Sequence, residues 1–407
     1  MTTPHHSFAT RAVHVGQEPD ARTGDVVPPL HVASTHVQDG VESLRGGYEY
    51  GRSANPTRDA FQVALADLEG GEAAFAFPSG MSAEDTLVRA LTRPGDHVSF
   101  GADVYGGTYR LFTIVKPAEG VRATPLDLTD LEAVAADVEK HDTALLWVET
   151  PSNPQLEVFD IAALARIAHE GGAILVVDNT FATPYLQQPL ALGADVVVHS
   201  TTKYIGGHSD LIGGAVVIRE GLELPRGRAG WTGSGKVVDE VRFVQQATGS
   251  IQSPRDAALA HRGLKTLAVR MDRHGASALA IARHLLDDPR VVAVHHPGLE
   301  SDPGHELAAR QMSGFGGVLS FEVGSAQVAR RVAETTRVFS LAVSLGATES
   351  LIEYPPVMTH AVKQGTADEL PQGLLRLAVG LEDVEDLIAD LDRAIGGAVA
   401  GGSADPD

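Results

Sequence analysis

The sequence contains no cysteine. Disulfide bonds, thiolate metal sites and cysteine nucleophiles are therefore excluded. Aromatic residues make up only 5% of the chain, and no apolar run approaches the length that spans a bilayer. The first residues also lack the apolar core of a signal peptide, so we expect a cytoplasmic protein with no membrane association.

Basic residues are also scarce, because 32 Lys and Arg stand against 53 Asp and Glu, for a formal charge of −21. This balance argues against a nucleic-acid partner, which would require clustered positive charge. The same charge balance is compatible with a small anionic ligand in a local basic pocket. The histidine pairs at residues 5–6 and 295–296 lack the i, i+4 spacing of a helical metal site, and we expect no metal.

The 407 residues suffice for two domains. Residues 1–58 are rich in Pro, Gly and His with little helical periodicity, which indicates an extended N-terminal arm. A helix is expected from Pro56, with Phe61, Leu65 and Leu68 on one face and an end at Gly70.

Strands and helices alternate through residues 59–253. The runs "AAFAF", "DHVSF", "TALLWVE", "AILVVD" and "ADVVVH" are typical of strands buried on both faces. The stretch "SAEDTLVRALTR" predicts a helix with Ser82 as its N-cap. The expected fold is α/β, with a mainly parallel sheet covered by helices. Residues 254–398 predict a smaller α+β domain, and residues 399–407 a flexible tail.

Ligands of open α/β sheets bind at the carboxyl ends of the strands, and several apolar runs end in reactive residues. The stretch "VVHSTTKYIGGHSD" presents Lys203 after a buried strand, flanked by Ser200 and Thr202. Desolvation would lower the pKa of such a lysine and make it a nucleophile, although a solvated loop lysine is an equal alternative. The run "AILVVDNT" ends in Asp178, followed by Thr180.

Two further strand ends add to this pattern. In "FPSGMSAE", Gly80 and Met81 would offer free amides at a helix N-terminus, which suits a phosphate. Tyr105, in "DVYGGTYRLF", could stack on a flat ring. Pyridoxal phosphate requires an amine for its aldehyde, a carboxylate for its ring nitrogen and donors for its phosphate. In this sequence the amine would be Lys203 and the carboxylate Asp178. The phosphate donors would be the amides of residues 80–81 and the hydroxyls of residues 200 and 202.

Longer motifs add a resemblance to a known family. The stretches "YEYGRSANPTR", "PSGMSA", "DVYGGT", "VETPSNP", "VVDNTFATPYLQQPLALGADVVVHSTTKYIGGHSD", "RGLKTLAVRM", "SLGATESLIEYPPVMTH" and "LLRLAVGLED" resemble the Cys/Met-metabolism family of fold type I pyridoxal-phosphate enzymes. The match runs from about residue 8 to 396. It implies a seven-stranded-type sheet domain and a catalytic set of Lys203, Tyr105 and Asp178.

The resemblance also implies roles that the bare residues do not show. Tyr50 and Arg52 match positions that reach the cofactor phosphate of a neighbouring subunit, which implies a homodimer, usually paired into a dimer of dimers. Asn153 matches a residue near the phenolic oxygen of the cofactor. Ser344 and Arg376 match the clamp for the substrate carboxylate, a task that suits a bidentate guanidinium.

The choice of reaction depends on fewer residues. The turn Ser344-Leu345-Gly346 lacks the preceding aromatic residue of β-lyases. Val343 stands where cystathionine enzymes carry glutamate, as in methionine γ-lyases, whereas Glu49 and Arg110 match the cystathionine type. The resemblance therefore favours γ-elimination on L-cystathionine with relaxed specificity. Cystathionine γ-synthase and methionine γ-lyase are the alternatives.

Two other interpretations are weaker. A cofactor-retaining regulator would not need Lys203, Tyr105 and Arg376 together, and no GxGxxG motif follows the first strand, which excludes a nicotinamide-binding Rossmann domain. Residues 220–241 are longer than the family's usual connection at this point, and we expect a surface insertion or a reshaped loop there.

Overall fold

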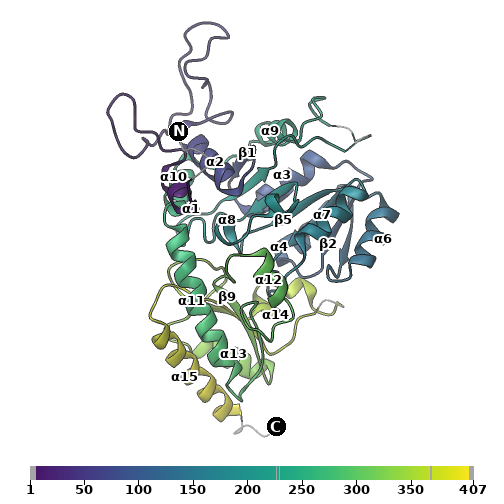
Figure 1. The fold of residues 1–407 in the computed structure, drawn as a ribbon, viewed down its shortest axis with the longest axis vertical. Coiled ribbons are helices and arrows are strands. Elements are labelled where there is room, and N and C mark those ends of the chain that lie inside the picture. The colour runs from purple at the N-terminus through teal and green to yellow at the C-terminus, as the bar shows by residue number, and fades with distance from the viewer. Residues whose placement is uncertain (1–5, 226, 229, 367–368, 403–407) are drawn as a thin grey trace.

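The computed structural model describes residues 6–225, 227–228, 230–366 and 369–402. Its helices and strands form two sheet-based regions, and the N-terminal segment extends from one end of the larger region (Figure 1). Among the described residues, no helix is long and apolar enough to cross a membrane.

The larger region is built on a seven-stranded sheet with the order β1-β7-β6-β5-β4-β2-β3. Every neighbouring pair is parallel except those that involve β7, which runs antiparallel to β1 and β6. The mainly parallel sheet predicted from the sequence is thus confirmed. The strands are β1 (Ala73–Phe77), β2 (His97–Gly101), β3 (Arg122–Leu126), β4 (Leu145–Glu149), β5 (Ile174–Asp178), β6 (Val196–His199) and β7 (Gly214–Ile218).

Both faces of this sheet are covered, which explains its continuous apolar strands. In β4, Leu145 and Trp147 pack on one face and Leu146 and Val148 on the other. Helices α3 (Gly80–Leu91), α4 (Gly106–Arg110) and α9 (Val237–Thr248), with the π-helical turn η1 (Leu111–Val115) and α5 (Lys116–Ala118), cover the first face. The second face carries α2 (Pro56–Glu69), α6 (Leu131–His141), α7 (Ile161–Glu170), α10 (Pro254–Leu264), α8 (Thr183–Leu186) and the 3-10 turn η2 (Pro189–Leu192).

The helix predicted from Pro56 is confirmed. Asn55 caps it by accepting the amides of Thr57 and Arg58, and Gly70 ends it in a left-handed conformation. The predicted cap of the next helix is wrong, because α3 begins at Gly80 and Ser79 is its N-cap. The Ser79 hydroxyl accepts the amide of Ser82 at 3.1 Å, which places Ser82 inside the first turn.

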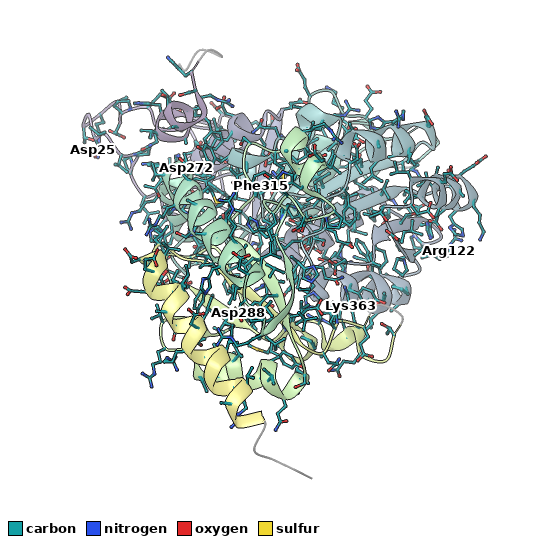
Figure 2. The ribbon with its side chains drawn as sticks, turned by 60° about the horizontal axis from the view of Figure 1, so that its bottom comes forward. Asp25, Arg122, Asp272, Asp288, Phe315 and Lys363 are labelled. Carbon is teal, nitrogen blue, oxygen red and sulfur yellow. The ribbon has the colours of Figure 1, made fainter. Side chains whose placement is uncertain are left out.

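The arm is not entirely extended. Residues Phe8–His14 form α1, which the sequence analysis did not predict, and its buried Ala12 contacts the core. After α1 the segment is irregular up to α2, with isolated bridges such as Thr35 to Tyr50. Asp25 marks the periphery of this segment (Figure 2).

The smaller region contains a five-stranded sheet with the order β10-β11-β12-β9-β8. Its strands are β8 (Val291–His295), β9 (Val318–Val323), β10 (Ser340–Leu341), β11 (Leu351–Glu353) and β12 (Leu374–Ala378). The accompanying helices are α11 (Leu267–Leu286), α12 (His305–Gln311), α13 (Ala326–Thr335), α14 (Pro355–Met358), η3 (Ala361–Lys363) and α15 (Val384–Gly402). Helix α15 continues into the predicted tail, and residues 403–407 lie outside the described residues.

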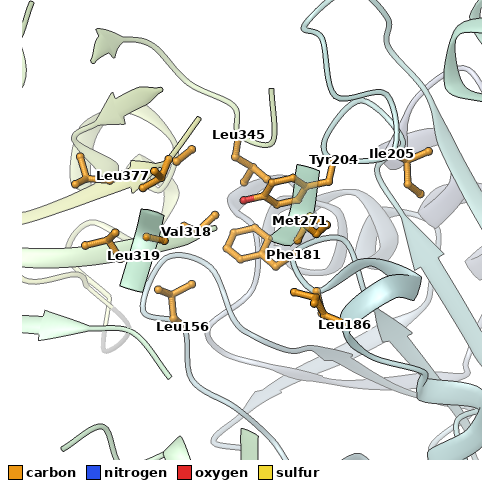
Figure 3. Packing of buried hydrophobic residues seen from close by; sticks show 14 of the residues in the cluster. Leu156, Phe181, Leu186, Tyr204, Ile205, Met271, Val318, Leu319, Leu345 and Leu377 are labelled. Carbon is orange, nitrogen blue, oxygen red and sulfur yellow. The ribbon is translucent and has the colours of Figure 1, made fainter. Parts of the chain in front are cut away.

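One hydrophobic cluster joins the two regions. Phe181 and Tyr204, from the large sheet region, pack with Leu319, Leu345 and others from the smaller one (Figure 3). Both aromatic residues lie within three positions of a predicted site residue, Asp178 or Lys203. The packing of the two regions therefore fixes the position of the loops that carry these groups.

Candidate active site

A cavity of about 250 Å³ lies at the carboxyl ends of the parallel strands of the large sheet. Because β1, β2, β4, β5 and β6 point the same way, the loops that follow them meet at one edge. The predicted site residues that line the cavity are Gly80, Met81, Tyr105, Asn153, Asp178, Thr180, Ser200, Thr202, Lys203, Val343, Ser344 and Arg376.

Lys203 lies in the turn after β6, and its Nζ donates a hydrogen bond to Ser344 Oγ at 2.7 Å. Desolvation and, to a smaller extent, the nearby Arg376 charge lower the pKa of Lys203 to about 8, while the charge of Glu353 opposes the shift. An amine with this pKa is neutral in a substantial fraction of molecules near neutral pH. Lys203 is thus prepared for nucleophilic or proton-transfer chemistry.

Asp178 is the last residue of β5 and is buried. Its Oδ1 accepts the amide of Thr180 at 2.9 Å, and the Thr180 hydroxyl accepts the amide of Ser200 at 2.8 Å. Burial raises the pKa of Asp178, whereas hydrogen bonds from Thr180 and the charge of His199 oppose the rise. A cationic ring nitrogen bound beside it would relieve this cost of desolvation.

The N-terminus of α3 lines one side of the cavity with Ser79, Gly80 and Met81. A Cβ at Gly80 would lie 3.1 Å from the Cβ of Ser200, so glycine lets the helix end approach the loop of Ser200. The first amides of the helix have no partner within it. The Thr202 hydroxyl accepts the Gly213 amide at 3.0 Å and donates to the Gly213 carbonyl, so its proton is already engaged.

Tyr105 follows β2 and immediately precedes α4. Its amide donates to Glu149 Oε2 at 2.8 Å, which fixes the backbone at the turn. A Cβ at Gly107 would come within 2.4 Å of the Tyr105 ring and 2.8 Å of Met81 Sδ. Gly107 is therefore required for Tyr105 to keep this position over the cavity.

Arg376, in β12, is buried and held from several sides. Its guanidinium donates to Asn153 Oδ1 at 2.9 Å and to the Ser344 carbonyl at 2.7 Å, and it pairs with Glu353 Oε2 at 3.0 Å. The buried Nε has no hydrogen-bond partner within the described part of the chain. A guanidinium with one donor still unused is suited to a substrate carboxylate.

Four predicted residues do not line this cavity: Glu49, Tyr50, Arg52 and Arg110. Tyr50 is 45% exposed, and Arg52 donates to the carbonyl of Gln246 at 2.6 Å. Arg110 is exposed at the end of α4. The predicted contact of the arm with a neighbouring subunit stays a prediction, since one chain is described.

Several cavity residues escaped the sequence analysis, chiefly Ser79, Glu84, Glu149 and Phe181. Glu353, which pairs with Arg376 next to the cavity, escaped it as well. Glu149 is the last residue of β4, so the strand-end rule that singled out Asp178 could have found it. Glu353 is a different case, because it meets Arg376 only through the antiparallel register of β11 and β12. Only the folded structure reveals such a pairing.

The long connection at residues 220–241 lies apart from the cavity. Trp231 donates from its indole nitrogen to the Arg89 carbonyl at 3.0 Å, and Arg93 lies 4.2 Å above its ring. Glu240 accepts the amides of Trp231 and Thr232. Trp231 thus packs against the C-terminal end of α3, in agreement with the predicted surface position.

One cluster outside the cavity has metal-ligand composition, namely His97, Asp137 and His141. The ring nitrogens of His97 contact the hydroxyls of Thr143 at 3.0 Å and Thr124 at 2.8 Å. Neither nitrogen is left free for an ion, so we assign this cluster to hydrogen bonding. Of the histidine pairs, His296 is buried, whereas His5 lies outside the described residues.

Comparison with known proteins agrees with this geometry. The family model described as "Cys/Met metabolism PLP-dependent enzyme" matches residues 9–396. Cystathionine gamma-synthase of Mycobacterium tuberculosis is 51% identical over 389 residues, which cover 95% of this chain and 96% of the relative. Cystathionine beta-lyase of Coxiella burnetii is 45% identical over 391 residues, with coverage of 95% and 97%.

A solved structure shows that the fold is shared as well. Cystathionine gamma-lyase from Lactobacillus plantarum, complexed with L-serine, superposes with a TM-score of 0.88 and 40% identity, covering 97% of this chain and 100% of that one. The three relatives share one family but carry three different reaction names. The chain belongs to the Cys/Met metabolism family of pyridoxal-phosphate-dependent enzymes, with pyridoxal phosphate as its cofactor.

Proposed function

We propose that this enzyme acts at the γ-carbon of an amino acid, either an O-acylhomoserine or cystathionine, and so makes or breaks cystathionine. The contact chain from Lys203 through Ser344 to Arg376 carries this proposal, because it joins an amine of lowered pKa to a carboxylate clamp. The names of the relatives supply the substrate class.

Of the two candidate reactions, γ-replacement is the one that we favour. In this reaction cysteine displaces the acyloxy group of an O-acylhomoserine, and cystathionine forms. The sequence analysis placed γ-elimination of cystathionine first, partly on Glu49 and Arg110. These two residues lie away from the cavity in the single chain, which reduces their weight. The 51% identity to a cystathionine gamma-synthase then favours replacement. Elimination stays the second candidate, supported by the likeness to a cystathionine gamma-lyase.

The residues of the cavity fit the cofactor, and each would have a separate role. When bound, pyridoxal phosphate supplies the electron sink for carbanion chemistry. Lys203 would hold the cofactor and, once displaced, move protons at Cα and Cβ of the substrate. Asp178 would keep the ring nitrogen protonated. Gly80, Met81 and Ser200 would bind the phosphate.

The substrate side has its own group of residues. Arg376, with its unused Nε, and Ser344 would hold the α-carboxylate. Tyr105 would lie against the ring and transfer a proton at the departing γ-substituent. Val343 lines the cavity with half of its side chain exposed and would accept an apolar substrate tail.

We further propose a homo-oligomer in which Tyr50 and Arg52 complete a neighbouring site. This proposal rests on the family resemblance and on the exposure of both side chains in the single chain.

The test is a product analysis of the purified holoenzyme. It is incubated with L-cystathionine, with L-methionine, and with O-acetyl- or O-succinylhomoserine plus cysteine, and cystathionine, 2-oxobutyrate and pyruvate are quantified separately. We expect net cystathionine from the acylhomoserine mixture at the highest kcat/KM. Faster release of 2-oxobutyrate from cystathionine would instead establish the γ-lyase, and from methionine the methionine γ-lyase. Pyruvate as the main product would place the cleavage at Cβ and refute the proposal.

A further inference from the structure

Glu84 is a buried acid in the cavity to which no role has been given above. It lies four residues after Gly80 in α3, so both residues are on the same face of the helix. Its side chain is buried, with the residue 3% exposed, and it lines the same cavity as Asp178 and Lys203. Glu84 is therefore one helical turn deeper than the amides expected to bind the phosphate.

The two carboxyl oxygens of Glu84 differ in their surroundings. Oε1 accepts a hydrogen bond from the Thr108 hydroxyl at 3.1 Å. Oε2 is buried and has no hydrogen-bond partner in the described part of the chain. A buried carboxyl oxygen without a partner is costly, so its partner is expected to be a molecule bound in the cavity.

The charge state of Glu84 follows from its neighbours. Three buried carboxyl groups, those of Glu84, Glu149 and Asp178, line one cavity. Burial raises the pKa of Glu84 well above its usual value, and the Asp178 charge raises it further, while Thr108 opposes the rise. The raised pKa favours the protonated form of Glu84, in which Oε1 accepts from Thr108 and the unpartnered Oε2 carries the proton as a donor.

We propose that Glu84 is a positioning residue of the cofactor cavity, which donates a hydrogen bond from Oε2–H to bound pyridoxal phosphate. An uncharged donor here orients the ring without adding a second negative charge beside Asp178. The inference rests on the proposed cofactor site but not on the choice between γ-replacement and γ-elimination.

The experiment compares Glu84→Gln, which keeps a neutral donor of the same shape, with Glu84→Leu, which removes it. Asp85→Asn is the matched control, because Asp85 is on the same helix but pairs with Arg89 and Lys116 outside the cavity. Cofactor affinity and the visible absorbance band of the bound cofactor are measured without substrate. Borohydride reduction followed by peptide mapping first verifies that the cofactor is attached at Lys203, so failure of the site itself is recognised separately.

We expect Glu84→Gln and Asp85→Asn to keep the wild-type affinity and band. Glu84→Leu should bind the cofactor about tenfold more weakly, with a shifted band, as expected for one lost buried hydrogen bond. An equal loss of cofactor affinity in Glu84→Gln and Glu84→Leu would mean that the negative charge of Glu84 is what matters, and it would overturn the proposal. Wild-type behaviour of both would overturn it as well.

A second measurement serves if Glu84→Leu fails to fold. The infrared difference spectrum between wild type and Glu84→Gln should contain the C=O stretching band of a protonated carboxyl group, and this band should shift when the cofactor binds. A carboxylate band in its place, or a carboxyl band unmoved by the cofactor, would refute the donor role.

Discussion

The cavity and the N-terminal arm, which we propose to complete the site of a neighbouring subunit, differ in almost every physical respect. The cavity is formed within one chain, and its Lys203 and Arg376 are fixed by contacts to other elements. Asp178 accepts the amide of Thr180 in the loop that follows its strand. The arm between α1 and α2 instead exposes large apolar side chains, with Val26 at 79% and Val41 at 97%. Figure 1 shows this segment extending away from the sheet domain.

The cavity and the arm are held in place by different interactions. Groups in the cavity are positioned by the hydrophobic cluster that joins the two sheets, so their geometry depends on intrachain packing. The exposed valines of the arm gain nothing from the hydrophobic effect in a single chain, and contiguous exposed apolar surface usually marks an interaction site. Chemistry in the cavity and completion of the site by the arm should therefore be separable by experiment.

The largest effect is expected at the centre of the cavity. Lys203→Ala should fold normally, because the side chain donates to Ser344 and to no other group among the described residues. It should nevertheless lose at least about a thousandfold in kcat, within the range for proton transfer. Turnover and circular dichroism together check this. Activity within a factor of about a thousand of wild type would show that another group performs the proton transfers.

A second effect in the cavity is its pH dependence. Since the pKa of Lys203 is lowered to about 8, the free amine is protonated below this pH and neutral above it. Only the neutral amine attacks the aldehyde, so reconstitution of the apoenzyme with pyridoxal phosphate should slow about tenfold per unit below pH 8, roughly a hundredfold at pH 6. Stopped-flow absorbance measures the rate. A rate that keeps rising up to pH 10 would indicate a lysine of ordinary pKa.

The same contrast explains what the sequence could predict. Strand-end residues such as Asp178 and Lys203 were identified because parallel strands bring their carboxyl ends to one edge, whatever the details of packing. The Ser79 cap was misplaced by three residues, since Ser79 and Ser82 have similar capping ability and the sequence does not show that the helix begins at Gly80. Glu353 could not be found, because its meeting with Arg376 depends on a strand register set by the whole smaller sheet.

The arm itself is tested by mixing two inactive variants. Arg52→Ala should lose activity if Arg52 completes a neighbouring site, and Lys203→Ala is inactive within its own cavity. In a randomised mixture, half of the dimers are hybrids with one intact site, so about a quarter of the wild-type activity should return. Subunit exchange is verified with differently tagged chains. If exchange is complete and no activity returns, the arm serves its own chain or no site at all.

The smallest effect is expected at Val343. This residue lines the cavity, but its side chain is exposed to solvent like those of the arm, with 51% of its surface accessible. Val343→Glu would place a carboxylate near the distal ammonium group of cystathionine, and an exposed ion pair contributes only about 0.2–1 kcal/mol. The ratio of kcat/KM for cystathionine over methionine should therefore rise by roughly 1.4- to fivefold at low salt, and the gain should shrink as salt screens the pair. Val343→Gln, which has similar size but no charge, is the control. An equal change in both variants, or a gain that salt does not reduce, would mean that side-chain shape at the mouth sets specificity instead of charge.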